Sequence, residues 1–364
     1  MRTCMKILII TNHSYMLYRF RRALIAELQK EHEVVLSMPF VGHEEDFQAM
    51  GLRCINTKID RRGINPKTDF KLILAYRKLL KEERPDLVIT YSIKPNVYAG
   101  LLCAASGIPY CVNVQGLGTA FQRRGLSKVV TVLYKLALRK AKTVFFENWG
   151  NAREFINRKI VPDNKVTVLN GAGANLEEFA AKPYPENEKV HFLYLGRFMK
   201  EKGIHELCTA VRRLHGEMGD RMMLDLVGFF DDDDCVEQVN QLVADGIATF
   251  HGFQSEPRPF YAAADCVVMP SYHEGMSNVL LEAASVGRPI ITTDIHGCKE
   301  AVDDGKTGLL CRVKDADDLY EKMRMIALLS REERMDMGHA AREKMEREFD
   351  KNDVVRNNVN ALFR

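Results

Sequence analysis

Residues 195–203 read LGRFMKEKG, and residues 271–291 read SYHEGMSNVLLEAASVGRPII. An apolar run leads into each stretch. HFLYLGR (191–197) overlaps the start of the first, and CVVMP (266–270) directly precedes the second. In both places a buried strand is expected to pass through a glycine-containing loop into a helix, and this order is typical of α/β proteins with parallel sheets. The two stretches therefore predict a parallel sheet with charged loops at its strand ends.

The same order of strand, loop and helix continues outward from these two stretches. The strands expected in the first half are KILIIT (6–11), EVVLSM (33–38), LVIT (87–90), IPYCVNV (108–114) and TVFFEN (143–148). The further strands expected in the second half are MMLDLVG (222–228), ATFHG (248–252) and RPIITT (288–293). Segments long enough for helices separate them, which predicts parallel strands joined by right-handed crossovers.

The polar stretch AAKPYPENEK (180–189) holds two prolines and has no apolar periodicity, so it is expected to be a linker. We expect a first Rossmann-like domain over residues 1–180 and a second over 181–350. The final helix, 351–364, is a candidate to cross back to the first domain. Ligands of doubly wound sheets bind outside the carboxyl ends of the strands, so we expect the two domains to face each other across a ligand-binding cleft.

Composition fits an ordinary globular protein of two domains. The chain has 364 residues, of which 46% are hydrophobic and 28% charged. It contains no apolar run of about 18 residues and no signal-peptide pattern, so a cytoplasmic location is expected. Nine cysteines without a close CxxC pair or Cys/His cluster predict buried free thiols and no metal site.

Charge divides the chain into two unlike halves. Residues up to 180 contain 28 basic and 16 acidic side chains, a net of +12, and the remainder contains 24 and 33, a net of −9. A basic half could face nucleic acid, an anionic membrane or an anionic substrate, and charge alone does not choose among them.

The LGRFMKEKG stretch predicts a cradle for a diphosphate. Gly196 allows the backbone to approach a ligand, while Arg197 and Lys202 place two cations near a helix N-terminus that itself favours anions. The alternative is that both cations are solvated loop residues.

The SYHEGMS stretch supplies carboxylates close to the same ligand. Glu274 lies in the loop and Glu282 one turn into the helix, where each could accept hydrogen bonds from sugar hydroxyls. The N–H groups of residues 275–278 are expected to point towards phosphate oxygens. The full pattern of strand, Glu-Gly loop and helical Glu is far less frequent by chance than either glutamate alone.

These motifs resemble those of the retaining glycosyltransferases of family 4, whose two-domain architecture is called GT-B. The resemblance covers nearly the whole chain and rests on Gly196-Arg197, Lys202-Gly203, the Glu274 to Glu282 spacing, and Gly297-Cys298-Lys299-Glu300 before Asp304-Gly305. It implies that Arg197 and Lys202 hold the donor diphosphate, that Glu274 contacts the donor sugar, and that Glu282 binds the ribose. The remaining donor-binding candidates are Gly196, Gly228, Phe253, Gly275, Met276, Ser277 and Asn278, with Gly228 and Phe253 placed near the nucleotide base.

The first half resembles bacterial enzymes that extend lipid-linked saccharides for capsule, O-antigen or glycoprotein glycans, including N-acetylgalactosamine transferases. The motifs are SIKPNVYAG (92–100) and NVQGLGTAF (113–121). The acceptor-side candidates are Asn12, His13, Lys94 and Gln115. Many family members carry Gly-Gly where this chain has Asn12-His13-Ser14 and a histidine where Gln115 stands. An amide cannot accept a proton at neutral pH, so Gln115 is not assigned as a base.

The resemblance implies transfer of a hexose or N-acetylhexosamine from a UDP-sugar, with retention, to an undecaprenyl-diphosphate-linked saccharide. No cofactor or metal is expected, and four acids at 231–234 suit a helix start better than a metal site. No nucleic-acid partner is expected. The alternatives are a GT-B-shaped nucleotide-sugar epimerase and a non-catalytic partner subunit of a glycosyltransferase.

A lipid-linked acceptor together with the basic first half predicts docking on the inner face of the cytoplasmic membrane. Two sets of basic and aromatic residues are candidates. The first comprises Tyr15, Tyr18, Arg19, Phe20, Arg21 and Arg22, and the second comprises Arg123, Arg124, Lys128, Lys135, Arg139, Lys140 and Lys142. The sequence does not show whether the members of a set share one face.

Overall fold

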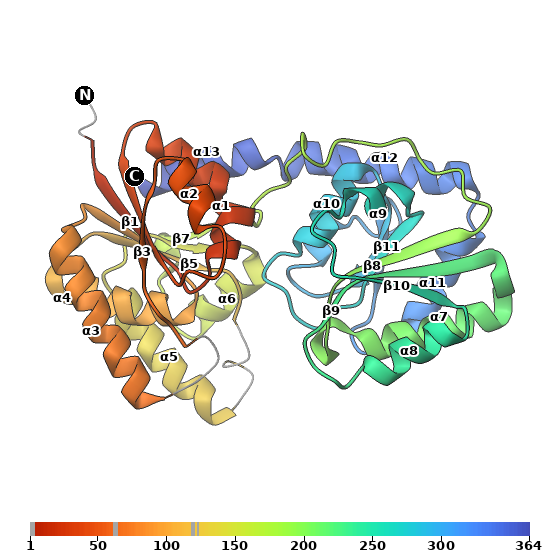
Figure 1. Cartoon of the computed structure of the whole chain (residues 1–364), viewed down its shortest axis with the longest axis horizontal. Coiled ribbons are helices and arrows are strands. Elements are labelled where there is room, and N and C mark those ends of the chain that lie inside the picture. Colours follow the sequence, from red (N-terminus) through yellow and green to blue (C-terminus); the bar gives the residue numbers. More distant parts are fainter. Residues whose placement is uncertain (1–3, 61–64, 118–120, 122–123) are drawn as a thin grey trace. The chain divides into compact units, whose positions relative to one another are not determined.

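A computed structural model describes residues 4–60, 65–117, 121 and 124–364. Its contacts divide the chain into two compact units (Figure 1). Unit 1 comprises residues 1–172 and 352–364, and unit 2 comprises residues 173–351. The division falls after Ala172, earlier than the boundary at 180 that the sequence suggested.

Unit 1 is a seven-stranded parallel sheet in the order β3-β2-β1-β4-β5-β6-β7. Its strands are β1 (Lys6–Ile10), β2 (Glu33–Met38), β3 (Arg53–Asn56), β4 (Leu87–Tyr91), β5 (Tyr110–Val114), β6 (Val144–Phe146) and β7 (Val166–Val168). Its helices are α1 (Ser14–Gln29), α2 (Glu44–Ala49), α3 (Pro66–Glu83), the π-helical turn η1 (Pro95–Ala99), α4 (Gly100–Ser106), α5 (Arg124–Leu138), α6 (Trp149–Asn157) and α13 (Lys351–Leu362).

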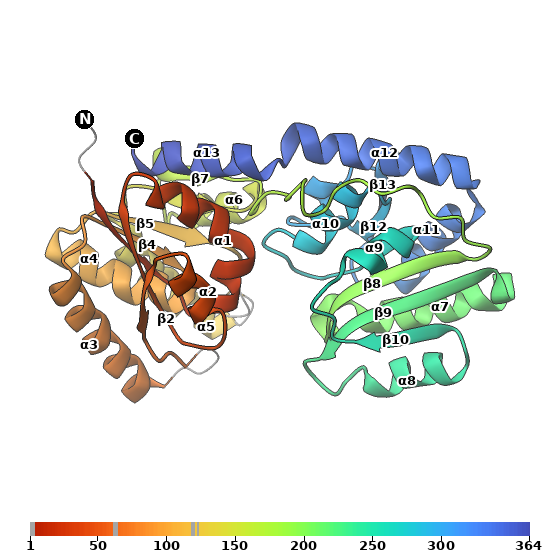
Figure 2. The same ribbon diagram turned by 45° about the horizontal axis from the view of Figure 1, so that its top comes forward.

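Alternate residues of the unit 1 strands enter two separate cores. Ile7 and Ile9 of β1 pack with α1, α2 and α13, whereas Leu8 and Ile10 pack with α3, α4 and α5. This alternation follows from the two-residue period of a strand. Helices α1 and α5 therefore cover opposite faces of the sheet, as Figure 2 shows.

Unit 2 repeats the plan with six parallel strands in the order β10-β9-β8-β11-β12-β13. The strands are β8 (Val190–Phe198), β9 (Met222–Phe230), β10 (Ala248–Gly252), β11 (Cys266–Met269), β12 (Ile290–Thr293) and β13 (Gly308–Cys311). The helices are the 3-10 turn η4 (Lys200–Lys202), α7 (Ile204–Met218), α8 (Val236–Ala244), α9 (Arg258–Ala263), α10 (Asn278–Val286), the 3-10 turn η6 (Lys299–Ala301), α11 (Ala316–Leu328) and α12 (Arg331–Glu348). Helices α7, α8 and α11 cover one face, and α9, α10 and α12 the other.

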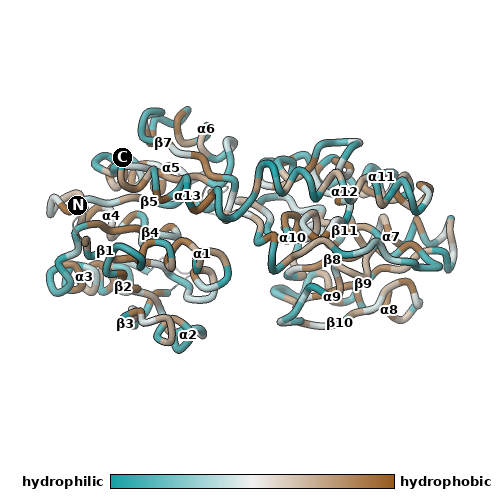
Figure 3. The backbone as a smooth tube through the Cα atoms, turned by 90° about the horizontal axis from the view of Figure 1, so that it is seen from above, coloured by the Kyte–Doolittle hydropathy of each residue, from teal (hydrophilic) through white to brown (hydrophobic). Residues whose placement is uncertain are grey.

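The strands are apolar and the outer helices polar, as expected for sheets buried on both faces. Figure 3 colours β1 and β11 brown and much of α12 teal. All nine cysteines are unpaired, and seven are buried; Cys4 is exposed and Cys54 half-buried. Within the described ranges, no helix is both long and apolar enough to cross a bilayer.

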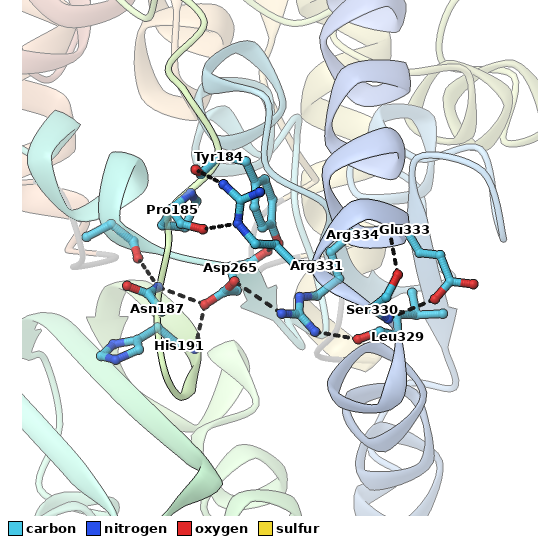
Figure 4. Close-up of polar contacts among 11 residues, drawn as sticks. Tyr184, Pro185, Asn187, His191, Asp265, Leu329, Ser330, Arg331, Glu333 and Arg334 are labelled. Carbon is cyan, nitrogen blue, oxygen red and sulfur yellow. Dashed lines mark hydrogen bonds and ion pairs between the residues drawn. The ribbon is translucent and has the colours of Figure 1, made fainter.

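The proline-containing stretch 180–189 is fixed to unit 2. The buried guanidinium of Arg288 donates to the carbonyl oxygens of Lys182 and Pro183, at 3.3 and 2.8 Å. Asp265, just before β11, accepts from the Asn187 side chain at 2.8 Å, and Figure 4 shows this contact. The stretch is irregular but packed, so composition alone gave the wrong impression of a linker.

Candidate active site

Lys202 and Glu274 meet at the carboxyl edge of the unit 2 sheet. Lys202 ends the η4 turn after β8, and Glu274 lies in the loop after β11. Their Nζ and Oε1 atoms form an ion pair, and the two side chains are 16% and 14% exposed. Because β8 and β11 are neighbours where the strand order reverses, this edge is the topological switch point of the sheet.

Backbone contacts hold the two loops together. The Tyr272 N–H donates to the Glu201 carbonyl oxygen at 2.9 Å. Gly203 has φ +71°, and a Cβ at this position would lie 2.1 Å from the Pro270 carbonyl oxygen. Only glycine allows this approach, which explains the glycine directly after Lys202.

Arg197 is the more open of the two cations. It lies near the end of β8, is 45% exposed, and donates from Nη1 to Asp231 Oδ2 at 2.8 Å. Asp232 accepts from the Lys200 N–H at 3.3 Å. The first two acids of the run at 231–234 thus hold the cradle loop, and none of the described residues form a metal-ligand cluster.

Two glycines bring β8 and β9 into close contact next to the loop that carries Arg197 and Lys202. Gly196 and Gly228 are register partners, and a Cβ on Gly228 would lie 1.7 Å from the Gly196 carbonyl oxygen. The packing of β9 against β8 therefore requires glycine at position 228. Phe253 and Phe229 are exposed neighbours with ring centroids 6.1 Å apart.

The start of α10 is less open than the sequence suggested. Ser277 caps the helix through its backbone, and its N–H donates to the Gly297 carbonyl oxygen at 2.8 Å. Met276 is buried in the core. The Ser277 N–H is already bonded within the protein, so the expectation that all N–H groups of residues 275–278 face a ligand is wrong at this residue. Gly275 and Asn278 are half-buried.

Glu282 lies on α10 and accepts a hydrogen bond from the Tyr261 hydroxyl of α9 at 2.9 Å. His273, beside Glu274, is exposed. Desolvation by neighbouring groups, and after it the charge of Lys314, lowers the pKa of His273. The lowered pKa favours the neutral imidazole. Both Glu282 and His273 lie on the segment that carries Glu274.

The four acceptor-side candidates follow strands of the unit 1 sheet. Asn12 and His13 come after β1, Lys94 after β4 and Gln115 after β5, so all lie towards its carboxyl edge. The Lys94 Nζ atom is 2.7 Å from Asp69 Oδ1, and both side chains are largely buried. The Lys94 charge is therefore balanced within the unit.

A buried ion pair that was not expected from the sequence lies at the same edge. Arg21 of α1 is 5% exposed and pairs with Glu147, which follows β6. Its guanidinium carbon also lies 5.6 Å from the Tyr91 ring centroid. Arg21 occupies the apolar stripe of α1 with Leu17 and Leu24, and that helical spacing is the signal that could have revealed its burial.

Two family models match the chain. "Glycosyl transferase 4-like" matches residues 6–148, and "Glycosyl transferases group 1" matches residues 189–328. Together they span most of both units.

Named relatives and solved structures agree with these matches. The chain is 28% identical over 351 residues to the N,N'-diacetylbacillosaminyl-diphospho-undecaprenol alpha-1,3-N-acetylgalactosaminyltransferase of Campylobacter jejuni, covering 91% of each chain. It is 25% identical to the capsular polysaccharide biosynthesis glycosyltransferase CapM of Staphylococcus aureus, covering 79% of each. Its fold matches that of Anabaena HepE in complex with UDP-glucose, with a TM-score of 0.81, 17% identity, and coverage of 98% of this chain and 99% of that one.

The family models and the named relatives indicate one reaction class, and none supports the epimerase or the partner subunit. The chain is a family 4 glycosyltransferase with the GT-B fold.

Proposed function

We propose that the protein transfers a hexose or N-acetylhexosamine from a UDP-sugar to an undecaprenyl-diphosphate-linked saccharide, with retention of anomeric configuration. The observation that carries this proposal is the meeting of Lys202 and Glu274, with Arg197 nearby, at the switch point of unit 2. The acceptor class is supported by the names of two relatives. One is the Campylobacter enzyme, and the other is the Escherichia coli UDP-Gal:alpha-D-GlcNAc-diphosphoundecaprenol alpha-1,3-galactosyltransferase, which is 24% identical.

In the proposed reaction, the bond between the anomeric carbon and the diphosphate oxygen breaks, and the acceptor hydroxyl oxygen forms a bond to that carbon on the same face. The acceptor's proton passes to the departing diphosphate oxygen, so no protein base is required. Arg197 and Lys202 stabilise the negative charge that develops on the diphosphate. The Lys202–Glu274 pair opens in this scheme, which leaves the glutamate for the donor sugar.

A donor panel tests the proposal most directly. Slow hydrolysis of UDP-, GDP- and ADP-sugars should be strongest for one UDP-sugar, and transfer should follow when a lipid-diphosphate saccharide is added. Activity should persist in EDTA, because Arg197 and Lys202 supply the positive charge. Loss of activity in EDTA that Mg²⁺ or Mn²⁺ restores would contradict the metal-free proposal, and hydrolysis of GDP-sugars alone would contradict the donor.

We further propose that unit 1 docks reversibly on the cytoplasmic face of the membrane through α5. The helix exposes three apolar side chains, Val129, Val132 and Leu136, at 56, 55 and 52%. Lys128, Lys135, Arg139 and Lys140 are exposed beside them, and α5 contains no acidic residue. An apolar ridge flanked by cations suits an anionic bilayer surface, and each cation contributes about 1 kcal/mol there.

Helix α3 adds further exposed apolar and basic side chains on the side of the sheet that carries α5. It packs on the same side of the sheet as α5 and exposes Phe70 and Leu74. Three lysines, Lys67, Lys71 and Lys78, are exposed on α3 within one turn of them.

The first candidate set does not belong to this face. Helix α1 covers the opposite side of the sheet, Arg21 is buried against Glu147, and Tyr18 stacks on His43 with centroids 4.2 Å apart. Of the second set, Arg123 lies outside the described residues, and the Lys142 Nζ atom donates to the Leu362 carbonyl oxygen at 3.2 Å. The docking proposal therefore rests on α5 and α3.

Co-sedimentation with phosphatidylglycerol vesicles tests this surface. Reversing Lys128, Lys135 and Arg139 to glutamate should weaken binding at least about tenfold at low salt. Replacing Val132 and Leu136 with serine should weaken the binding that remains at high salt. Arg22→Glu, on the other side of the sheet, is the matched control; equal losses from it, or no binding to vesicles at low salt, would refute the assignment.

A further inference from the structure

Helix α7 makes a tyrosine–glutamate hydrogen bond at each of its ends. Near its start, the Tyr272 hydroxyl lies 2.7 Å from both carboxylate oxygens of Glu206. Near its end, the Tyr320 hydroxyl donates to Glu217 Oε2. The two bonds are chemically alike, but one joins α7 to the loop of Glu274 and the other joins it to α11, which packs against α7 in Figure 1.

Each of the two tyrosine rings also has a cation over its face. Lys314 Nζ lies 4.9 Å from the Tyr272 ring centroid, and the Arg213 guanidinium carbon lies 3.8 Å from that of Tyr320. Both tyrosines are buried to the same degree, 6% exposed. The two tyrosines thus have similar burial and similar cation contacts but differ in their distance from the site. Their acceptors differ in one respect, since Glu217 also pairs with Arg324.

Tyr272 forms the second of two side-chain links between the same two segments. Lys202 at the end of η4 and Glu206 in the first turn of α7 lie four residues apart. Tyr272 and Glu274 lie two residues apart in the facing loop. Lys202 pairs with Glu274, and Glu206 bonds to Tyr272. When the Lys202–Glu274 pair opens to hold a donor, the second link can remain closed.

The Tyr272 hydroxyl is well suited to a permanent link. Burial, and after it the hydrogen bond to Glu206, raise the pKa of Tyr272 above its usual value, so the hydroxyl stays a donor throughout the working pH range. A hydrogen bond to a charged acceptor is among the stronger ones in proteins. Its backbone N–H bond to Glu201 reinforces the same junction.

We infer that Tyr272 is a positioning residue for glycosyl transfer. Its bond to Glu206 fixes the distance between the segments of Lys202 and Glu274 while the ion pair between them is open. The inference rests on the roles proposed above for Lys202 and Glu274. Small displacements of reacting groups reduce rate far more than binding, so the effect should appear in kcat.

The test compares Tyr272→Phe with Tyr320→Phe, each of which removes one hydroxyl from an equivalent bond. Tyr272→Phe should lower kcat about tenfold and change the Kd for UDP less than about twofold. Tyr320→Phe should leave kcat within about twofold of the parent enzyme, although both variants lose similar thermal stability. Glu206→Gln should resemble Tyr272→Phe, and the double variant should be no worse than the poorer single variant.

Equal kcat values for Tyr272→Phe and Tyr320→Phe would overturn the inference, as would fully additive losses in the double variant. If Tyr272→Phe fails to fold, Glu206→Gln replaces it, and Tyr320→Phe remains the control because Glu217 also pairs with Arg324. Lys202→Ala and Glu274→Gln separate the two levels: full activity in these variants refutes the proposed site itself, whereas their loss with an unaffected Tyr272→Phe refutes only the positioning role.

Discussion

The carboxyl edges of the two sheets use charged side chains differently. In unit 1, Arg21 and Lys94 are largely buried, and each pair ties a helix to a loop after a strand. In unit 2, Arg197 is 45% exposed, and Lys202 joins two loops that follow neighbouring strands. Both sheets have the same order through their first six strands, so topology alone does not create the difference.

The contrast shows which ion pairs can exchange partners. A buried guanidinium that loses its carboxylate stays desolvated without compensation, so the Arg21 pair is a fixed part of the fold. A pair at a loop edge can open towards a ligand that carries its own negative charge. We therefore expect substitutions in unit 1 to change stability and those in unit 2 to change chemistry.

The largest effect is expected for Arg21→Met. The variant leaves Glu147 buried without its cation, so the free energy of unfolding should fall by about 3–5 kcal/mol in chemical denaturation. The affinity for UDP should not change. Arg22→Met, next to it but exposed, is the control and should change stability by less than about 0.5 kcal/mol; equal effects of the two variants would erase the contrast.

Lys202→Ala should show the reverse pattern. The kcat should fall about a hundredfold, because a charge that stabilises the leaving diphosphate is lost, whereas the free energy of unfolding should fall less than it does for Arg21→Met. By calorimetry, binding of UDP should weaken more than binding of uridine. Lys200→Ala, an exposed lysine in the same turn, serves as control. Equal losses for UDP and uridine would show that Lys202 does not contact phosphate.

Glu282→Ala is expected to raise the donor KM about tenfold with a small change in kcat, since the carboxylate is proposed to bind the ribose. Glu274→Ala should mainly lower kcat. Tyr261→Phe removes only the hydroxyl that bonds to Glu282 and should have the smaller effect on KM. Wild-type kinetics in both glutamate variants would remove these residues from the site.

The smallest effect concerns the pH dependence of stability in unit 2. Asp225 accepts hydrogen bonds from His191 and His251, at 3.0 and 2.7 Å. The hydrogen bond that His191 donates to Asp225 raises the pKa of His191. Burial would raise the pKa of Asp225, but the two histidines outweigh it and lower that pKa.

These shifts fix the sign of the pH effect. The His191 contribution is fully present below pH 6.5, the ordinary pKa of histidine, and is lost as pH rises through the raised pKa. The Asp225 contribution is present above 3.8 and is lost as pH falls through the lowered pKa. Asp225→Asn should therefore cost about 1 kcal/mol near pH 5.5 and less at pH 9. A cost that is independent of pH in thermal melts would show that no charge is involved.

The long apolar runs determined most of the fold from the sequence alone. The ten strands expected from them are all present. The strands β3, β7 and β13 were missed, and each is a short strand at a sheet edge. An edge strand is buried by fewer neighbours, so its sequence carries a weaker apolar signal.

Irregular segments could not be judged from composition. Residues 180–189 are polar, yet Arg288 and Asp265 hold them in place from more than 70 residues away in the sequence. In the α5 segment the charges are visible in the sequence, but only the packed helix shows that Lys128, Lys135 and Arg139 are all exposed beside an apolar ridge. Burial depends on distant partners, and these are absent from a local pattern.

The sequence by itself determined that Arg197, Lys202 and Glu274 lie in loops after buried strands, because strand, glycine and helix start are local signals. Tertiary structure alone decided that Lys202 meets Glu274, 72 residues later, since this follows from the adjacency of β8 and β11. It also decided that Arg21 is buried while Arg22 is exposed, and that Tyr272 bonds to Glu206. Local chemistry sets which groups a strand end carries, whereas the order of strands in the sheet sets which of those groups can touch.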